Sequence, residues 1–388
     1  MKAPRTIAVV TGSRADYGLQ YWVIRALHES SIFTLQLIVT GSHLSDAFGR
    51  TVDQIRADGF PIAAEVPMIA ADDSEWAMAR STGDGVTGMA DAFRRLAPDL
   101  VIMPGDRFEI LAAATAAMLM GIPIAHLHGG EVTEGAVDES IRHAVSKMSA
   151  LHFVSAEPYR QRLIRMGEDP ARVIVVGAPG LDHYTRTALP SREQLLSGLG
   201  LDAGKPFLLV TYHPATRGEA SPVDAVAQLL DALERFPDQQ VLITKANADA
   251  GGRAINAALE KYAAARSGRV VLVASLGTPR YLSAVTHASA LIGNSSSALI
   301  EAPAVNTPTV NIGPRQQGRL RAASVVDCAE DSAAIVAAIE TALGPGFRDQ
   351  AADTEPPYGR PGDAAGRMMA ALASVDLDTL RIKRFHDA

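Results

Sequence analysis

The stretch PDLVIMPGDRFEILAAATAAMLMGIPIAHLHGG, residues 98–130, holds two short apolar segments separated by an alanine-rich helical segment. Continuous apolar strands joined by a helix of ten or more residues are typical of a parallel sheet covered on both faces. Residues 110–125 carry no charge, but they fall short of the about 20 apolar residues of a membrane span. Gly121 and Pro123 also interrupt them. We therefore expect a buried helix followed by a strand, within an α/β fold.

The same alternation continues on both sides of this unit. Segments that contain a strand are expected at 6–12, 34–41, 150–156 and 172–180, and then at 206–214, 240–249, 269–275, 290–302 and 308–315. The polar segment 183–206, which contains glycine and proline, is the best candidate for a linker between the two halves. We expect two Rossmann-like domains that face each other across a cleft, with a boundary near residue 186.

Composition argues against several classes of protein. The chain has 388 residues, too many for one core, and a net charge of −7 without a block of lysine or arginine. This charge argues against nucleic acid or an anionic membrane as a partner. The single cysteine, Cys328, rules out an internal disulfide and fits a reducing cytosol, so we expect a cytoplasmic protein.

Polar residues gather where the predicted strands end, which is where open α/β sheets bind ligands. They are Arg14, Asp16, His43, Asp106, His126 to Asp138, His213, Asn247, Asp249 and Asn294 to Ser297. The first turn, TGSRADYG at 11–18, lacks the G-x-G-x-x-G fingerprint, which argues against a hydride-transferring NAD enzyme. Arg14 can hold a phosphate or carboxylate through two hydrogen bonds, or it can pair with Asp16 on the surface.

Titratable residues are densest in HLHGGEVTEGAVDESIRHA, residues 126–144. His128, Glu131 and Asp138 in this stretch are candidates for proton transfer, together with Asp106 after the preceding strand. Neighbouring carboxylates raise one another's pKa values, which prepares an acid near neutral pH. The alternative for Asp106 is a simple ion pair with the arginine that follows it.

A helix that begins near Val137 would place Asp138 and Arg142 on one face, and likewise Glu139 and His143. These are either ordinary helix ion pairs or part of a site. The two histidines at the start of the stretch would share one face of a strand. Because the cysteine and histidine spacing of structural zinc is missing, we expect no metal.

In the second half, GNSSSALIEA at 293–302 predicts a strand, three serines and the start of a helix. Backbone N–H groups and hydroxyls at a helix N-terminus suit an anion such as a diphosphate, although helix capping alone also explains serines there. Glu301 could accept hydrogen bonds from ribose hydroxyls. His213, at the end of the first strand of this half, could bind a phosphate or serve a structural role.

At these residues the sequence resembles the hydrolysing UDP-N-acetylglucosamine 2-epimerases of sialic acid and related nonulosonic acid biosynthesis. The likeness runs from about Thr6 to Val326 through TGSRADYGL, GDRFE, HGGE, DESIRHAVSKMSALHF, VVGAPGLD, NADAGGRAIN, GNSSSALIEAP and TVNIGPRQQGR. It implies a glycosyltransferase-B-type fold with a catalytic domain at 1–185 and a nucleotide-binding domain at 186–365. It also implies that a helix in 366–388 packs back on the first domain, and that the protein is a homodimer or homotetramer.

The resemblance suggests roles residue by residue. Near the nucleotide it places Arg14, His213, Ser295, Ser296 and Glu301, to which the serine motif adds Ser297. As catalytic carboxylates it suggests Asp106 and Asp138. Glu131 is a weaker candidate with an orienting role, and the residues expected to orient the substrate are His43, Arg142 and Asn247.

One departure from the family bears on the substrate. Sialic-acid members commonly read His-x-Glu-Gly-Gly, whereas this chain has His128 in place of the glutamate, with one extra residue between Gly130 and Asp138. A histidine at this position resembles members that act on 4-acetamido-6-deoxy sugars, the precursors of legionaminic acid. Either branch implies a UDP- or GDP-linked amino sugar as substrate.

The implied reaction is an anti-elimination, in which the nucleoside diphosphate leaves C1 while a base takes the C2 proton from the opposite face. Water then adds to the resulting glycal, and a proton returns to C2 from the other side. Asp106, His128 and Asp138 would share these proton transfers, without a cofactor or a metal. The rival functions are a non-hydrolysing epimerase, a glycosyltransferase of the same fold and a non-catalytic nucleotide-sugar sensor.

Overall fold

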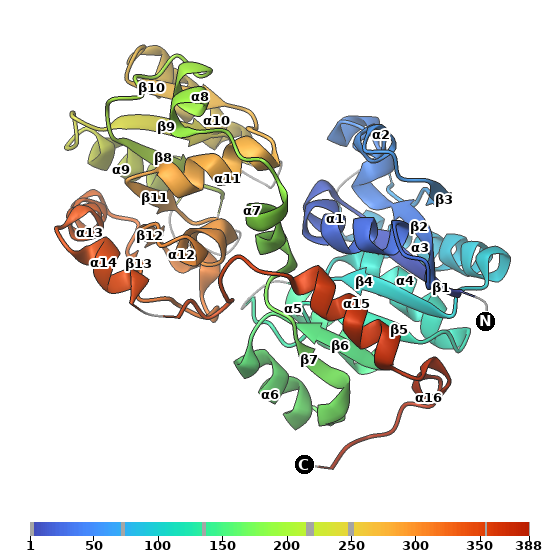
Figure 1. The fold of residues 1–388 in the computed structure, drawn as a ribbon. Helices are drawn as coiled ribbons and strands as arrows, with labels where there is room; N and C mark the ends of the chain where they lie inside the picture. The colour runs from blue at the N-terminus through green and yellow to red at the C-terminus, as the bar shows by residue number, and fades with distance from the viewer. Residues whose placement is uncertain are drawn as a thin grey trace. The chain divides into compact units, whose positions relative to one another are not determined.

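A computed structural model describes residues 4–70, 74–133, 137–214, 221–246, 252–353 and 355–387. The chain divides into two compact units (Figure 1). Unit 1 consists of Met1–Asp182 together with Asp363–Ala388, and unit 2 of His183–Gly362. The boundaries expected from the sequence are at residues 186 and 366.

Unit 1 is built on a parallel seven-stranded sheet in the order β3-β2-β1-β4-β5-β6-β7. Its strands are β1 (Arg5–Thr11), β2 (Phe33–Thr40), β3 (Ile62–Val66), β4 (Leu100–Pro104), β5 (Ile124–Leu127), β6 (Leu151–Val154) and β7 (Val173–Val175). Its α-helices are α1 (Arg14–His28), α2 (Val52–Ala57), α3 (Glu75–Leu96), α4 (Phe108–Leu119), α5 (Val137–Met148), α6 (Glu157–Arg165), α15 (Ala364–Ser374) and α16 (Leu377–Leu380).

The central strands of unit 1 are mostly apolar because both faces of the sheet are covered. In β1, Ile7 and Val9 belong to one apolar cluster, while Ala8 and Val10 belong to the cluster on the opposite face. Helix α15 returns to unit 1 (Figure 1, red), where its Met368 packs fully buried in the same cluster as Ile7.

Unit 2 repeats this architecture with a parallel six-stranded sheet in the order β10-β9-β8-β11-β12-β13. Its strands are β8 (Phe207–Thr211), β9 (Gln240–Thr244), β10 (Val270–Val273), β11 (Ala290–Gly293), β12 (Thr309–Ile312) and β13 (Val325–Cys328). Its α-helices are α7 (His183–Arg186), α8 (Arg192–Ser197), α9 (Pro222–Leu233), α10 (Gly252–Ala264), α11 (Thr278–His287), α12 (Glu301–Ala304), α13 (Ser332–Leu343) and α14 (Phe347–Ala352).

The prediction of two Rossmann-like α/β domains is confirmed, with two strands added. The additional strands, β3 and β13, are edge strands in which about half of the residues or more are partly exposed, so neither produces a continuous apolar run. Leu195 and Leu196, within the segment predicted as a linker, belong to a buried cluster of unit 2. None of the helices in the described residues has the length and apolar character that a membrane span requires.

Candidate functional site

Arg142 is the centre of a polar group at the carboxyl end of the unit 1 sheet. Helix α5 begins at Val137, as predicted, and its Arg142 is only 1% exposed. The guanidinium donates to the carboxylate of Asp106, which follows β4, to Glu139 Oε2 at 2.7 Å and to the backbone oxygen of Glu131 at 3.0 Å. The loops after β4 and β5 are thereby tied to the first turns of α5.

The ion pairs in this group differ from those expected. Arg142 makes no hydrogen bond to Asp138 among the described residues, because its guanidinium is occupied by Asp106 and Glu139. The alternative pairing of Asp106 with the arginine beside it is also wrong, since that arginine binds Glu109. The predicted pair of Glu139 and the histidine one turn later is present, at 3.0 Å.

His128 and Glu131 form a buried pair. His128 Nδ1 donates to Glu131 Oε1 at 2.8 Å, and the Ser155 hydroxyl donates to the same oxygen at 2.8 Å. In the neutral ring the other nitrogen, Nε2, is then unprotonated, and it has no hydrogen-bond partner among the described residues. The His128 backbone has a φ of +63°, a left-handed conformation that costs a non-glycine residue about 1–2 kcal/mol. Such strained residues cluster at functional sites.

Asp138 lies half-buried in the first turn of α5. Its burial and the negative charge of Asp106 raise the pKa of its carboxyl. Asp138 and Asp106 are therefore electrostatic neighbours at one end of the sheet. A carboxyl with a raised pKa can carry a proton closer to neutral pH.

Two of the histidines singled out by the sequence are fully buried and bonded on both sides. His43 contacts the hydroxyls of Thr11 at 3.0 Å and Thr51 at 2.7 Å, and burial lowers the pKa of its ring to about 4. These contacts favour a structural role for His43 instead of the predicted substrate-orienting one. His126 donates from Nε2 to the Gly105 carbonyl at 2.7 Å, and its Nδ1 lies 3.1 Å from a serine hydroxyl.

His126 and His128 therefore do not share a set of partners. In the part of the chain that the structure describes, no group of three or more His, Cys, Asp or Glu side chains is arranged to hold a metal ion.

The start of α1 contributes a second group that the sequence analysis did not recognise. Arg14 is exposed, and no ion pair between it and Asp16 occurs among the described residues, because Asp16 is buried. The neighbours that electrostatically influence Asp16 are Glu109, Arg107 and Asp106. Only the surface pairing of Arg14 and Asp16 was considered from the sequence, since the other residues lie about ninety positions away.

In unit 2, Asn294 holds the ends of two neighbouring strands together. Its side-chain oxygen accepts from the backbone N–H of His213 at 2.8 Å, and its side-chain nitrogen donates to the His213 carbonyl at 2.8 Å. The Asn294 carbonyl accepts from Arg315 at 3.0 Å and Gln316 at 2.9 Å. His213, the serines after Asn294 and the loop after β12 are thus brought together, as expected for residues at strand ends.

The helix expected after the serines is shorter than predicted. Ser296–Ala298 form a single 3₁₀ turn, and α12 covers only Glu301–Ala304. A helix of this length has little macrodipole, so an anion here would depend on the serine hydroxyls and local N–H groups. The Ser295 hydroxyl caps the turn by accepting from the Ser297 N–H at 3.4 Å. Asn247 lies outside the described residues.

Aromatic side chains enclose this part of unit 2. Burial, with a smaller effect from the charge of Glu301, raises the pKa of the Tyr281 phenol to about 12. Glu301 also raises the pKa of Tyr184, after the larger effect of burial. The two phenols and Glu301 therefore lie close together beside the serines.

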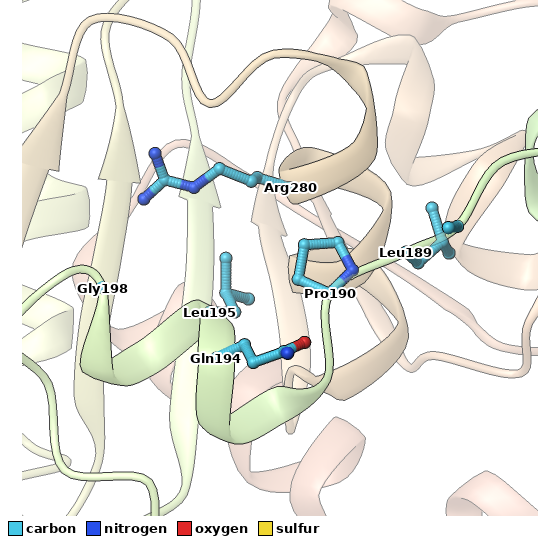
Figure 2. A pocket seen from close by; sticks show the side chains of 7 residues that line it. Leu189, Pro190, Gln194, Leu195, Gly198 and Arg280 are labelled. Carbon is cyan, nitrogen blue, oxygen red and sulfur yellow. The ribbon is translucent and has the colours of Figure 1, made fainter.

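The pocket in Figure 2 lies elsewhere in unit 2. It has a volume of about 640 Å³ and is lined by Leu189, Pro190, Gln194, Leu195, Arg280 and two small residues. It is open to solvent and contains none of the predicted site residues. In each unit, the candidate site residues lie at the carboxyl ends of the strands, where the polar networks described above are found.

Comparison with known proteins places the chain in a family. The sequence profile described as UDP-N-acetylglucosamine 2-epimerase matches residues 25–373. The chain is 38% identical over 323 residues to the GDP/UDP-N,N'-diacetylbacillosamine 2-epimerase (hydrolyzing) of Campylobacter jejuni, covering 83% of this chain and 84% of that protein. It is 38% identical over 339 residues to the UDP-N,N'-diacetylbacillosamine 2-epimerase (hydrolyzing) of Legionella pneumophila, covering 87% and 89%.

Solved structures agree on the fold. The UDP-GlcNAc 2-epimerase from Neisseria meningitidis, crystallised bound to UDP-GlcNAc, superposes with a TM-score of 0.81 at 18% identity. The superposition covers 95% of this chain and 100% of the Neisseria meningitidis chain. The family profile and the two relatives also confirm the resemblance drawn from the motifs. The chain belongs to the UDP-N-acetylglucosamine 2-epimerase family of enzymes.

Proposed function

We propose that this enzyme is a hydrolysing nucleotide-sugar 2-epimerase whose substrate is nucleotide-linked N,N'-diacetylbacillosamine. The proposed type of reaction is supported mainly by one group of side chains at the carboxyl end of the unit 1 sheet. The group consists of Asp106, Arg142, His128, Glu131 and Asp138. The choice of sugar is supported by the two relatives of 38% identity, whose names specify this substrate. UDP-N-acetylglucosamine, named by the family, is the second candidate.

In this proposal His128 is the base that removes the C2 proton. Its Nε2 is unprotonated when Nδ1–H is bonded to Glu131, and a lone pair without a partner is what a general base requires. Glu131 fixes the tautomer and stabilises the imidazolium that forms, as the carboxylate does in a nucleophile–His–Asp triad. The histidine in place of the family's glutamate thereby keeps a base at this position.

Asp138 is proposed as the acid that returns a proton to C2 after the nucleoside diphosphate has left. Its raised pKa lets the carboxyl hold that proton before delivery. Asp106 is proposed to activate the water that adds to C1, with Arg142 holding its carboxylate in one orientation. General acid–base catalysis of this kind contributes about 10²–10⁴-fold for each group.

The nucleotide is proposed to bind through Arg14 and through residues of unit 2. There, His213 and the serines Ser295, Ser296 and Ser297 would receive the diphosphate, and Glu301 the ribose. The products would be the free nucleoside diphosphate and a free N-acetylmannosamine-type sugar, which nonulosonic acid biosynthesis consumes. We also propose that the enzyme is cytoplasmic and forms a homodimer or homotetramer. Sedimentation of the purified protein would test the oligomeric state.

A panel of nucleotide sugars without any acceptor tests this function. The enzyme is incubated with UDP- and GDP-linked N,N'-diacetylbacillosamine and with UDP-N-acetylglucosamine, and the products are followed by NMR. We expect fastest release of the nucleoside diphosphate, together with the free 2-epimer, from a diacetylbacillosamine substrate. Faster turnover of UDP-N-acetylglucosamine would select the second candidate, and binding without turnover would select a sensor.

A further inference from the structure

Two buried carboxyl groups meet at Gly12, just after the end of β1, and neither belongs to the proposed acid–base group. Asp16, 7% exposed, accepts from the Gly12 N–H at 3.3 Å, and Glu109 is fully buried at 0%. A Cβ placed on Gly12 would lie 2.4 Å from Glu109 Cγ, so the glutamate packs directly on that turn. A Cβ on Gly41 would also lie 3.1 Å from Glu109 Oε1.

The guanidinium of Arg107 bonds to one of these carboxyl groups and acts on the other through its charge. Arg107 donates from Nε to Glu109 Oε1 at 2.8 Å, while its side chain remains 46% exposed. Glu109 Oε2 is buried and has no hydrogen-bond partner among the described residues. If Asp16 and Glu109 were both ionised, the three side chains would carry a net negative charge that is buried and only partly balanced. Such an arrangement is costly, and a proton on one carboxyl removes the imbalance.

The charged groups around Asp16 come from several elements. Burial is the main cause that raises its pKa to about 7; the charges of Glu109 and Asp106 add to the effect, while Arg107 opposes it. On the η1 side, at Gly41–Leu44, the nearby titratable group is His43, which is neutral at this pH because its own pKa is lowered to about 4. On α1 itself, Arg14 is exposed.

Arg107 connects this pair with the proposed acids. The charges of Glu109, Asp16 and Asp138 all stabilise its guanidinium. In turn, Arg107 lowers the pKa of Asp138, against the larger effects of burial and Asp106. A change in the charge of Asp16 is therefore felt at the carboxylates that the proposed reaction uses.

We propose that Asp16 is a positioning residue of the epimerase site, whose proton sets how strongly the Asp16–Glu109 pair holds Arg107. With the proton in place, the pair and Arg107 are neutral together. When the proton leaves, the guanidinium is drawn towards the pair, and one more negative charge stands beside Asp106 and Asp138. An anionic nucleotide sugar then binds and reacts less well. This inference rests on the proposed function.

The test compares Asp16→Asn with the wild type. Asparagine can still accept from the Gly12 N–H but cannot ionise, so the fold is kept while the titration is removed. We expect kcat/KM of the wild type to fall about tenfold between pH 6 and pH 9 with a midpoint near 7, since this profile reports the ionisations of the free enzyme. In Asp16→Asn the part of this fall that has its midpoint near pH 7 is absent. Asp91→Asn, at an exposed site of α3, serves as the matched control and keeps the wild-type profile.

A second readout does not need turnover. Carboxyl carbon shifts of ¹³C-labelled protein, assigned by the signal missing in Asp16→Asn, report the titration of Asp16. Exchange of the Arg107 Nε–H reports how firmly that group is held. We expect a titration near pH 7 and slower Nε–H exchange above it in the wild type only.

The activity profile and the NMR measurements together distinguish failure of the Asp16 proposal from failure of the proposed function. An Asp16 titration near pH 4, Nε–H exchange that does not follow it, or an unchanged profile in Asp16→Asn would overturn the positioning role. Absence of turnover with every nucleotide sugar of the panel would overturn the proposed function, while the shifts and exchange still decide what Asp16 does.

Discussion

The guanidinium of Arg142, buried on α5, donates directly to the carboxylate of Asp106 in the loop after β4. The two residues are thirty-six positions apart in the sequence, so the contact exists only when both strand-end loops are folded. The same guanidinium also holds Glu139 and the backbone of Glu131. It therefore organises the proposed acid–base group without being a proton donor to the sugar.

Replacing Arg142 by methionine should destabilise unit 1 strongly. Breaking a buried ion pair by removing one partner leaves the other charge uncompensated, which typically costs about 3–5 kcal/mol. The free energy of unfolding, measured by urea denaturation, should fall by that amount. Arg94→Met is the control, because its pair with Asp91 is exposed and should contribute less than about 1 kcal/mol. Equal losses in the two variants would contradict the role given to Arg142.

Replacing Asp138 by asparagine should abolish turnover and leave nucleotide binding intact. The amide keeps the size of the carboxyl group but cannot deliver a proton, so kcat should fall by about 10²–10⁴-fold. The affinity for UDP or GDP, measured by calorimetry, should stay within about twofold, since the proposed phosphate contacts lie on other residues. Turnover at the wild-type rate would remove Asp138 from the mechanism.

Replacing Glu131 by glutamine should keep the hydrogen bond to the proposed base, His128, but remove the negative charge beside it. A glutamine oxygen can still accept from His128 Nδ1, but it no longer stabilises the imidazolium by charge. We expect kcat to fall, because the imidazolium that forms on His128 loses the negative charge that stabilises it. Ser155→Ala, which removes only the second donor to the same oxygen, should have a smaller effect. Turnover of Glu131→Gln at the wild-type rate would argue against His128 as the base.

The buried Glu168 should make the free energy of unfolding depend on pH in the acid range. Burial alone would raise the pKa of its carboxyl, but hydrogen bonds from His152, Lys147 and Lys383 outweigh burial and lower it to about 2. Because the pKa in the folded protein lies below the usual glutamate value of 4.5, the stabilisation is complete above pH 4.5 and is lost as the pH falls through about 2.

A shift of this size corresponds to roughly 3 kcal/mol. The free energy of unfolding should therefore decline between pH 5 and pH 2 in the wild type and much less in Glu168→Gln. Glu157→Gln, at an exposed position, should keep the wild-type decline. The same decline in Glu168→Gln would contradict the assignment.

Gly293 at the end of β11 should not tolerate a side chain. Its φ is +140°, and a Cβ there would lie 2.0 Å from the Thr211 carbonyl oxygen of the neighbouring strand. Gly293→Ala should therefore force β8 and β11 apart and unfold unit 2 at a lower temperature. Gly268→Ala is the matched control, because it has a positive φ of +86° and nothing within 4 Å. Its cost should be only the backbone strain, about 1–2 kcal/mol.

The sequence predicted the architecture because the central strands are apolar on both faces, and this pattern is visible without any knowledge of tertiary contacts. The start of α5 was also predictable, since carboxylates and an apolar periodicity mark it. The edge strands β3 and β13 were not, because one exposed side leaves too few apolar residues. The helix after the serines was over-predicted, since Ser296–Ala298 form only a 3₁₀ turn and α12 covers only Glu301–Ala304.

Within the site, the sequence indicated which residues gather at the strand ends more reliably than which of them form hydrogen bonds with one another. His43 follows a strand and resembles a substrate contact, but its two threonine partners are set by the fold. The pairing of Arg142 with Asp106 instead of Asp138 depends on how two loops meet. The same holds for Asp16 and Glu109, whose proximity arises only where β1 and α4 converge on Gly12.

The most direct test of the proposed reaction is turnover of nucleotide-linked N,N'-diacetylbacillosamine in D₂O and, separately, in H₂¹⁸O. Elimination followed by water addition predicts a free sugar with inverted C2 that carries one deuterium there, and a nucleoside diphosphate without ¹⁸O because the C1–O bond breaks. An intact epimerised nucleotide sugar, a C2 that keeps its original hydrogen, or ¹⁸O in the released diphosphate would contradict it.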